Sequence, residues 1–254
     1  VAHLGMSLLF YLTAGVLLWE KRHSFWLQRS RFSQILGALL VAIALWQSFE
    51  LLHDPALTSP QLHPTLRLLP WVSAVAVGLL ASGWQGLKQY GQAITLLFFL
   101  GVPSVLFSFL PDLSPITAQF STGLLRLAGF DASVQDVYIS LPTGAVKVYA
   151  GCSGVESMTY LLGISVIALM LFPIARIKQV FVPILAMLIG FGVNGVRVAV
   201  MAVLVASQNQ AAFIYWHQGQ GSLIFGVVSV LVFGLCYRVL HQYSTKETHK
   251  TEMG

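Results

Sequence analysis

The chain has 254 residues, of which 56% are apolar and only 9% are charged. Soluble domains carry about 25% charged residues, so this composition excludes an ordinary soluble fold and indicates a protein surrounded largely by lipid. The net charge of +5 comes from 14 basic residues spread along the whole chain, and without a dense basic patch nucleic acid is not an expected partner.

Seven apolar segments have the length of transmembrane helices. A span needs about 20 mostly apolar residues to cross about 30 Å of hydrocarbon, and inside lipid a helix satisfies its own backbone polar groups. The predicted spans are 3–19, 33–52, 66–84, 92–110, 155–172, 180–206 and 222–240. We therefore predict an all-α polytopic membrane protein that forms a single integral membrane domain over 1–254. It has about seven transmembrane helices, or one more if a first helix precedes Val1, where the sequence starts inside an apolar run.

The positions of lysine and arginine predict the orientation, because cytoplasmic links carry an excess of both. Ten of the fourteen basic residues lie in one alternate set of segments, which comprises 20–31, 85–91, 173–179 and the C-terminal end. The other links hold only Arg126 and Lys147 and comprise 53–65, 111–154 and 207–221. We therefore expect a multi-pass protein of the cell (inner) membrane, with 243–254 as a cytoplasmic tail and the second set of links outside.

The longest link, 111–154, contains two patterns. Apolar side chains in 115–130 have helical spacing, which predicts a helix in the membrane interface. Apolar and polar residues then alternate on both sides of Pro142-Thr-Gly144, which predicts a small extracytoplasmic β-hairpin over 137–149. The second strand of this hairpin runs directly into Gly-Cys-Ser-Gly at 151–154.

Three polar residues fall on the predicted outer side. Cys152 precedes the span 155–172 and is flanked by Gly151 and Gly154. These glycines relax the backbone for the approach of a substrate chain. Arg197 is about 17 residues into 180–206, or about 26 Å above the cytoplasmic end of that span at about 1.5 Å per residue. His217 stands just before the last span. Together they form an acyl-transfer set with a nucleophile, a charge stabiliser and a general acid/base.

Structural roles are the alternative for each of these residues. A lone cysteine near a helix end is often a packing residue, as we expect for Cys236, and a disulfide between the two cysteines is not expected. His217 also fits an interfacial aromatic belt beside Tyr215 and Trp216. Arg197 is costly within a span, and it could form a packing clamp between helices with Asn194 and Glu156, the latter as its ion-pair partner. No Cys/His spacing resembles a closed metal site, and no cofactor is expected.

These motifs resemble the exosortase/archaeosortase family. The likeness lies in Cys-Ser-Gly-Val at 152–155, Asn-Gly-Val-Arg at 194–197 and His217, and it covers most of the chain from about residue 70. The run 79–90, Leu-Leu-Ala-Ser-Gly-Trp-Gln-Gly-Leu-Lys-Gln-Tyr, together with Cys-Ser-Gly-Val-Glu-Ser, looks most like the cyanobacterial branch, cyanoexosortase A. The family commonly has about eight spans, which agrees with a further helix upstream.

The resemblance implies a membrane cysteine transpeptidase or protease. Its substrates would be exported proteins with a C-terminal Pro-Glu-Pro-like motif, a transmembrane helix and a basic tail. Cys152 would form a thioester, Arg197 would stabilise the anion, His217 would move protons, and an acceptor outside the membrane would receive the protein. Candidates for substrate-binding or supporting residues are Tyr149, Ser153, Gly154, Glu156, Asn194, Trp216 and Gln218. The alternatives are a transporter or channel with a polar path at Arg197 and Glu156, and a non-catalytic scaffold.

Overall fold

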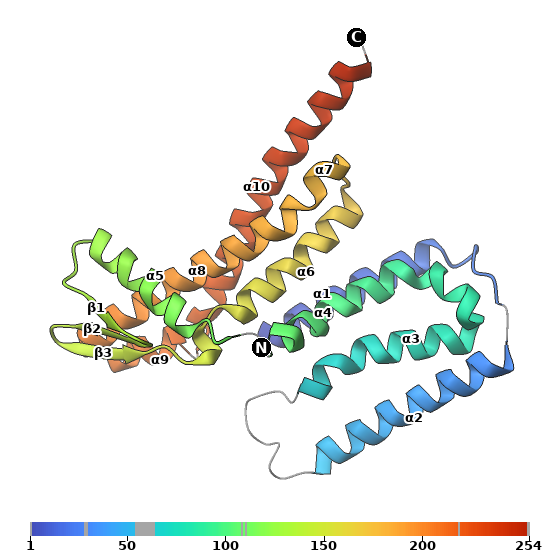
Figure 1. The fold of residues 1–254 in the computed structure, drawn as a ribbon, viewed down its shortest axis with the longest axis horizontal. Helices are drawn as coiled ribbons and strands as arrows, with labels where there is room; N and C mark the ends of the chain where they lie inside the picture. Colours follow the sequence, from blue (N-terminus) through green and yellow to red (C-terminus); the bar gives the residue numbers. More distant parts are fainter. Residues whose placement is uncertain are drawn as a thin grey trace. The chain divides into compact units, whose positions relative to one another are not determined.

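The computed structural model describes residues 2–27, 30–53, 64–107, 109, 111–217 and 219–252. Each of the seven predicted spans is a helix, and these helices are α1 (Ala2–Glu20), α2 (Arg31–His53), α3 (Pro64–Gly86), α4 (Gly91–Phe107), α6 (Val155–Leu171), α8 (Phe181–Ala206) and α10 (Gly221–Glu252) (Figure 1). The prediction of a polytopic helical membrane protein is therefore confirmed.

Length and apolar composition identify five segments of the described chain that can cross a membrane. They are Arg31–Glu50, Leu66–Phe107, Ala150–Leu171, Phe181–Ala206 and Gly221–Tyr243. The second segment contains both α3 and α4, and α1 adds a shorter apolar helix over Ser7–Glu20. The chain divides into two compact units, Val1–Phe109 and Leu110–Gly254. The single membrane domain predicted over 1–254 stays a prediction.

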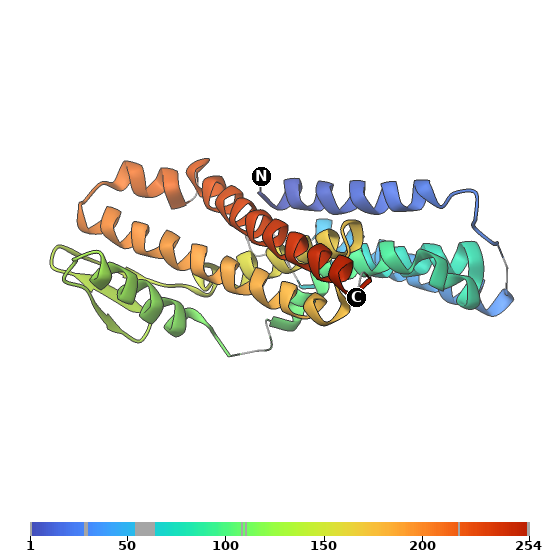
Figure 2. The same ribbon diagram turned by 90° about the horizontal axis from the view of Figure 1, so that it is seen from above.

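The first unit contains the four helices α1 to α4. α3 packs against α2 on one side and α4 on the other, and α1 packs against α4 (Figures 1 and 2). Near its end α3 has a non-helical residue, Gly83, whose φ of 66° lies in the region that favours glycine. The chain then turns through the short 3-10 helix η2 (Leu87–Tyr90) into α4.

The second unit is built around α8, which contacts α5 (Ser114–Leu127), α6, α10 and the small helices α7 (Arg176–Gln179) and α9 (Gln210–His217). Small residues bring its neighbours close. A Cβ added at Gly190 would lie only 2.8 Å from the carbonyl oxygen of Ser157 on α6, so glycine is required for this helix contact. α5 is the helix predicted from the spacing of apolar residues in 115–130, whereas α7 and α9 fall in segments predicted as links.

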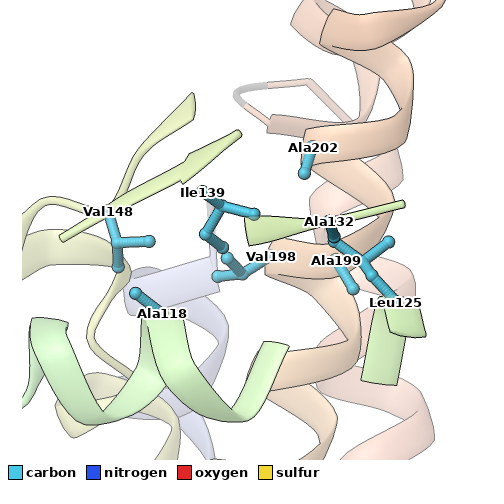
Figure 3. Packing of buried hydrophobic residues seen from close by; sticks show 8 residues of the cluster. All are labelled: Ala118, Leu125, Ala132, Ile139, Val148, Val198, Ala199 and Ala202. Carbon is cyan, nitrogen blue, oxygen red and sulfur yellow. The ribbon is translucent and has the colours of Figure 1, made fainter. Parts of the chain in front are cut away.

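A three-stranded antiparallel sheet covers the C-terminal part of α8. Its strands are β1 (Ser133–Gln135), β2 (Tyr138–Leu141) and β3 (Gly144–Lys147), in that order. The predicted hairpin is confirmed as β2 and β3, with Ile139 paired to Val146, and β1 is an additional strand. Residues from the sheet, α5 and α8 form one buried core (Figure 3), whose members include Ile139, Val148, Ala118 and Val198.

Candidate active site

A short turn between the sheet and α6 carries Cys152. Val148 is buried and its N–H still pairs with the carbonyl oxygen of Val137, so the sheet fixes the start of the turn. The 3-10 helix η3 (Ala150–Cys152) follows, and the N–H of Cys152 donates to the carbonyl oxygen of Tyr149 at 2.7 Å. Cys152 is partly buried against the core of the sheet, so its sulfur has a defined position rather than a free loop environment.

Two buried polar side chains from other helices fix this turn. Asn194 of α8, 3% exposed, donates its Nδ2–H to the carbonyl oxygen of Cys152 at 2.8 Å. Thr117 of α5, fully buried, donates its hydroxyl to the carbonyl oxygen of Ser153 at 2.7 Å. Each bond satisfies a carbonyl that would otherwise be costly to bury. The two carbonyl groups that follow the Cys152 side chain are therefore held by α8 and α5.

Gly154 is required beside these bonds. Its φ is 91°, in the left-handed region that is unfavourable for other residues. A Cβ at this position would also lie 3.1 Å from Nδ2 of Asn194, the atom that holds Cys152. Ser153, 2% exposed, donates its hydroxyl to the carbonyl oxygen of Ala150 at 2.6 Å. Ser153, Gly154 and Asn194 thus support the turn, and none of these three contacts engages the thiol itself.

His217 brings a base to the thiol. It is the last residue of α9, and its Nε2 lies 3.6 Å from Sγ of Cys152, a separation for a hydrogen bond to sulfur. The imidazole ring stacks on Phe213 of the same helix, with ring centroids 5.1 Å apart and an interplanar angle of 15°. Nδ1 is buried and has no hydrogen-bond partner among the residues that the structure describes. Ring stacking therefore orients this histidine.

Arg197 connects α8 to the same histidine. Its Nη2–H donates to the main-chain carbonyl oxygen of His217 at 3.0 Å, while Nε is buried without a partner within the described part of the chain. Burial lowers the pKa of His217 below its ordinary value of 6.5, and the positive charge of Arg197 lowers it further. The imidazole is therefore neutral at neutral pH, which is the form that accepts a proton. A thiol, a neutral base and a fixed cation thus lie together.

A sequence model of transmembrane exosortases matches residues 2–234 of this chain. The chain belongs to the transmembrane exosortase family. It is also similar to a probable archaeosortase E of Methanocaldococcus jannaschii, with 26% identity over 155 residues, which cover 60% of this chain and 81% of that protein. No solved structure matches. The closer likeness to cyanoexosortase A and the catalytic roles of individual residues stay predictions.

The other predicted site residues of this exosortase lie around the three central ones. Glu156, in the first turn of α6, acts electrostatically on the Cys152 side chain, and its predicted ion pair with Arg197 stays a prediction. The Trp216 ring packs against Phe225 at 5.8 Å, which joins α9 to α10. Tyr149 is 61% exposed, its ring lies 5.4 Å from Nζ of Lys147, and its carbonyl oxygen accepts the N–H of Cys152. Gln218 lies outside the described residues.

Two residues of the site were absent from the sequence prediction. Phe213 precedes His217 by four residues, so helical spacing would have placed both on one face if α9 had been predicted. Thr117 lies 36 residues before the carbonyl group that it binds, and nothing in its local sequence indicates that contact. Over the residues that the structure describes, no three His, Cys, Asp or Glu side chains form a group that could hold a metal ion.

Proposed function

We propose that this exosortase is a membrane-embedded cysteine transpeptidase that removes the C-terminal sorting signal of exported proteins. The observation that carries the proposal is the 3.6 Å approach of Cys152 Sγ to His217 Nε2, with Arg197 bound to the same histidine. Following the family resemblance, the substrate carries a Pro-Glu-Pro-like motif, then a transmembrane helix and a basic tail. This membership favours an enzyme over a transporter, a channel or a scaffold.

The first half of the reaction forms a thioester. Neutral His217 accepts the thiol proton at Nε2, and the thiolate of Cys152 attacks the carbonyl carbon of the scissile peptide bond. The tetrahedral intermediate then collapses. The bond from carbon to nitrogen breaks, and the leaving amine takes the proton from His217. The helix and tail of the substrate depart, and the exported part stays bound to the Cys152 sulfur as a thioester.

The second half transfers the exported part to an acceptor. His217 takes a proton from the acceptor nucleophile, which attacks the thioester carbon, and the bond from carbon to sulfur breaks. The Cys152 sulfur recovers a proton from His217, which restores the starting state. An amine or hydroxyl acceptor gives transpeptidation or ester formation, whereas water gives hydrolysis.

Arg197 is the proposed charge stabiliser of both halves. One of its N–H groups is bound to the His217 carbonyl, which fixes the guanidinium, and its buried Nε–H has no partner among the described residues. A buried donor without a partner is costly and often marks a functional group. A preorganised N–H donor aimed at a developing oxyanion contributes about 10²–10³ in rate. We assign this role to Arg197.

The proposed site lies on the extracytoplasmic side of the membrane. Within the second unit, η3 and Cys152 precede one end of α6, while Arg176 and Lys178 of α7 follow its other end. At about 1.5 Å per residue, the 17 residues of α6 separate the two ends by about 25 Å, close to the thickness of the hydrocarbon core. Basic residues favour the cytoplasm, which supports placing Cys152 outside.

Replacement of the two cysteines tests the proposal. Cys152→Ala is expected to abolish loss of the tail from a co-expressed sorting-signal substrate, measured by intact mass or by a tag on that tail. Cys236→Ala is the matched control, since Cys236 is the other free thiol, lies on α10 and has no part in the proposed chemistry. Unchanged processing by Cys152→Ala would contradict a cysteine mechanism.

A second measurement separates the halves of the reaction. The purified wild-type protein is incubated with a sorting-signal peptide and its intact mass is recorded. A mass increase equal to the exported part of the peptide, lost in Cys152→Ala but kept in Cys236→Ala, identifies the thioester. Release of this adduct by hydroxylamine, with no other acceptor present, shows that a nucleophile completes the second half of the reaction.

A further inference from the structure

An apolar cavity of about 570 Å³ lies in the first unit among α1, α3 and α4, far along the sequence from the proposed catalytic residues. Small side chains line much of it and leave the space open, and these include Ala14, Ala74, Ala81 and Ala93. Val77, which also lines the cavity, is 58% exposed, so the space opens onto the outer surface of α3. A lipid chain therefore has a way in from the membrane.

Polar contacts close one end of this cavity. Tyr90 lines the cavity, its hydroxyl is 2.7 Å from Ser82 Oγ, and its ring lies 5.1 Å from that of Phe25. Trp26 and Gln89 exchange two hydrogen bonds of 2.9 and 3.0 Å. The link that follows α1 is thus bound to η2 at the cavity end.

Positive charge gathers at the same end. Lys21 Nζ donates to the neutral amide oxygen of Gln92 at 2.7 Å, one residue before the cavity-lining Ala93. An ammonium group has three donors, and one of them is used within the described chain, so Lys21 keeps two for a ligand. Arg22 follows it and exposed Lys88 lies on η2, whereas the described segments 19–27 and 87–92 contain one acid, Glu20. The balance favours an anion beside this polar end of the cavity.

Exposed tryptophans mark this end as the level of lipid headgroups. Trp19, Trp26 and Trp84 are 67%, 67% and 68% exposed. Trp19 is the penultimate residue of α1, Trp26 is bound to η2, and the backbone N–H of Trp84 donates to Ser33 near the start of α2. Tryptophan concentrates where the headgroups begin. The polar end of the cavity therefore lies beside phosphate groups, and its apolar length extends into the acyl layer.

The volume of the cavity determines which kind of ligand it can hold. A transmembrane helix about 10 Å across and 30 Å long occupies about 2,400 Å³, several times the space available. Leu66 and Ala81 both line the cavity and are about 22 Å apart along α3 at about 1.5 Å per residue. A space of this length and volume suits a single extended hydrocarbon chain, and it excludes the helix of a protein partner.

We propose that this cavity binds one acyl chain of an anionic phospholipid, whose phosphate is held by Lys21. The lipid fills the space between α1, α3 and α4 and joins the three helices. The proposal is independent of the cysteine chemistry, because it rests on the first unit alone. On the charge distribution above, the lipid belongs to the cytoplasmic leaflet.

Native mass spectrometry of the full-length, delipidated protein tests the site. Palmitoyl-oleoyl phosphatidylglycerol and the phosphatidylcholine with the same chains are added separately. We expect one tightly held phosphatidylglycerol per chain. Ala74→Phe fills the cavity and should weaken the binding of both lipids at least about tenfold. This is the effect expected when two methylene groups of the acyl chain are no longer buried. Lys21→Gln should weaken phosphatidylglycerol about fivefold, since one basic residue near a lipid surface contributes that much. Phosphatidylcholine should weaken less, because its choline group offsets the charge of the phosphate.

Matched controls separate the site from general lipid contact. Leu45→Phe adds bulk on exposed α2, and Arg176→Gln removes a basic residue of the second unit; both should bind lipid as the wild type does. If Ala74→Phe is not monodisperse, Ala14→Leu fills the cavity from α1 instead. Equal binding of the two lipids by the wild type, or full retention by the cavity-filling variants, overturns the proposal. Displacement of the lipid by a synthetic sorting-signal helix also overturns it.

Discussion

The two units use buried polar side chains in opposite ways. In the second unit, Asn194 and Thr117 reach from two helices to hold neighbouring carbonyl groups of one turn. In the first unit, Ser33 and Ser82 bond near helix ends, where they connect α2 with α3 and α3 with η2. Hydrogen bonds from two helices to one turn fix the position of a reacting atom. Hydrogen bonds near helix ends instead leave a lipid-sized space between the helices. The comparison therefore predicts that substitution of buried polar residues lowers the processing rate in the second unit only.

After loss of the Cys152 thiol, removal of the charge at Arg197 should give the largest effect. Arg197→Ala is expected to lower the rate of signal processing by about 10²–10³, the cost of losing one oxyanion donor. Arg197→Lys keeps the charge but not the planar set of donors, so it should recover only part of this loss. Single-turnover kinetics with purified protein measure both. An Arg197→Ala variant that processes at the wild-type rate would remove Arg197 from the mechanism.

Gly154 offers a smaller, sharper perturbation of the same turn. Gly154→Ala must place a side chain at φ 91° and against Asn194, which should cost about 1–2 kcal/mol of stability and about tenfold in processing rate. Gly151→Ala is the matched control in the same turn, because a Cβ there meets nothing within 4 Å and its φ is not positive. Thermal unfolding in detergent and processing rates report the two effects. Equal behaviour of both variants would show that the turn need not be rigid.

Most of the fold could be predicted because lipid imposes simple rules on sequence. Each apolar segment long enough to span became a helix, and alternation on both sides of Pro142-Thr-Gly144 gave β2 and β3. β1 escaped prediction because three residues are too short to show a period of two. α9 escaped because 207–221 was interpreted only as a link between spans. Short elements like these are stabilised by the surfaces on which they pack, which local sequence does not encode.

The site could be predicted only in part. The motifs give the order of Cys152, Arg197 and His217, and the distribution of basic residues predicts a shared membrane side, so all three were named. Their arrangement depends on α9, which brings His217 to the Cys152 turn, and this path is a property of the folded chain. Thr117 shows the limit most clearly, because its hydroxyl is used by a carbonyl group 36 residues away.

The pH dependence of the reaction tests the second unit without changing its packing. The pKa of His217 is lowered by burial and by Arg197, so the neutral base persists below pH 6.5 and is lost only as the pH falls further. The acidic limb of kcat/KM should therefore lie below 6.5. Arg197→Gln removes one of the two causes, so the limb should move up toward 6.5, whereas Arg197→Lys should leave it in place. A limb above 6.5 in the wild type would contradict a buried neutral histidine.

The smallest effect is expected in the first unit, where Ser82→Ala removes the hydrogen bond to Tyr90. Since Ser82 is 1% exposed, the phenol loses a buried partner, which should cost about 1 kcal/mol in the free energy of unfolding. The processing rate should stay within about twofold, because nothing in the Cys152 turn depends on this bond. Thermal unfolding and single-turnover rates on the same preparation measure both quantities. A rate loss comparable to that of Gly154→Ala would show that the first unit also positions the reacting groups, and the contrast between the units would then fail.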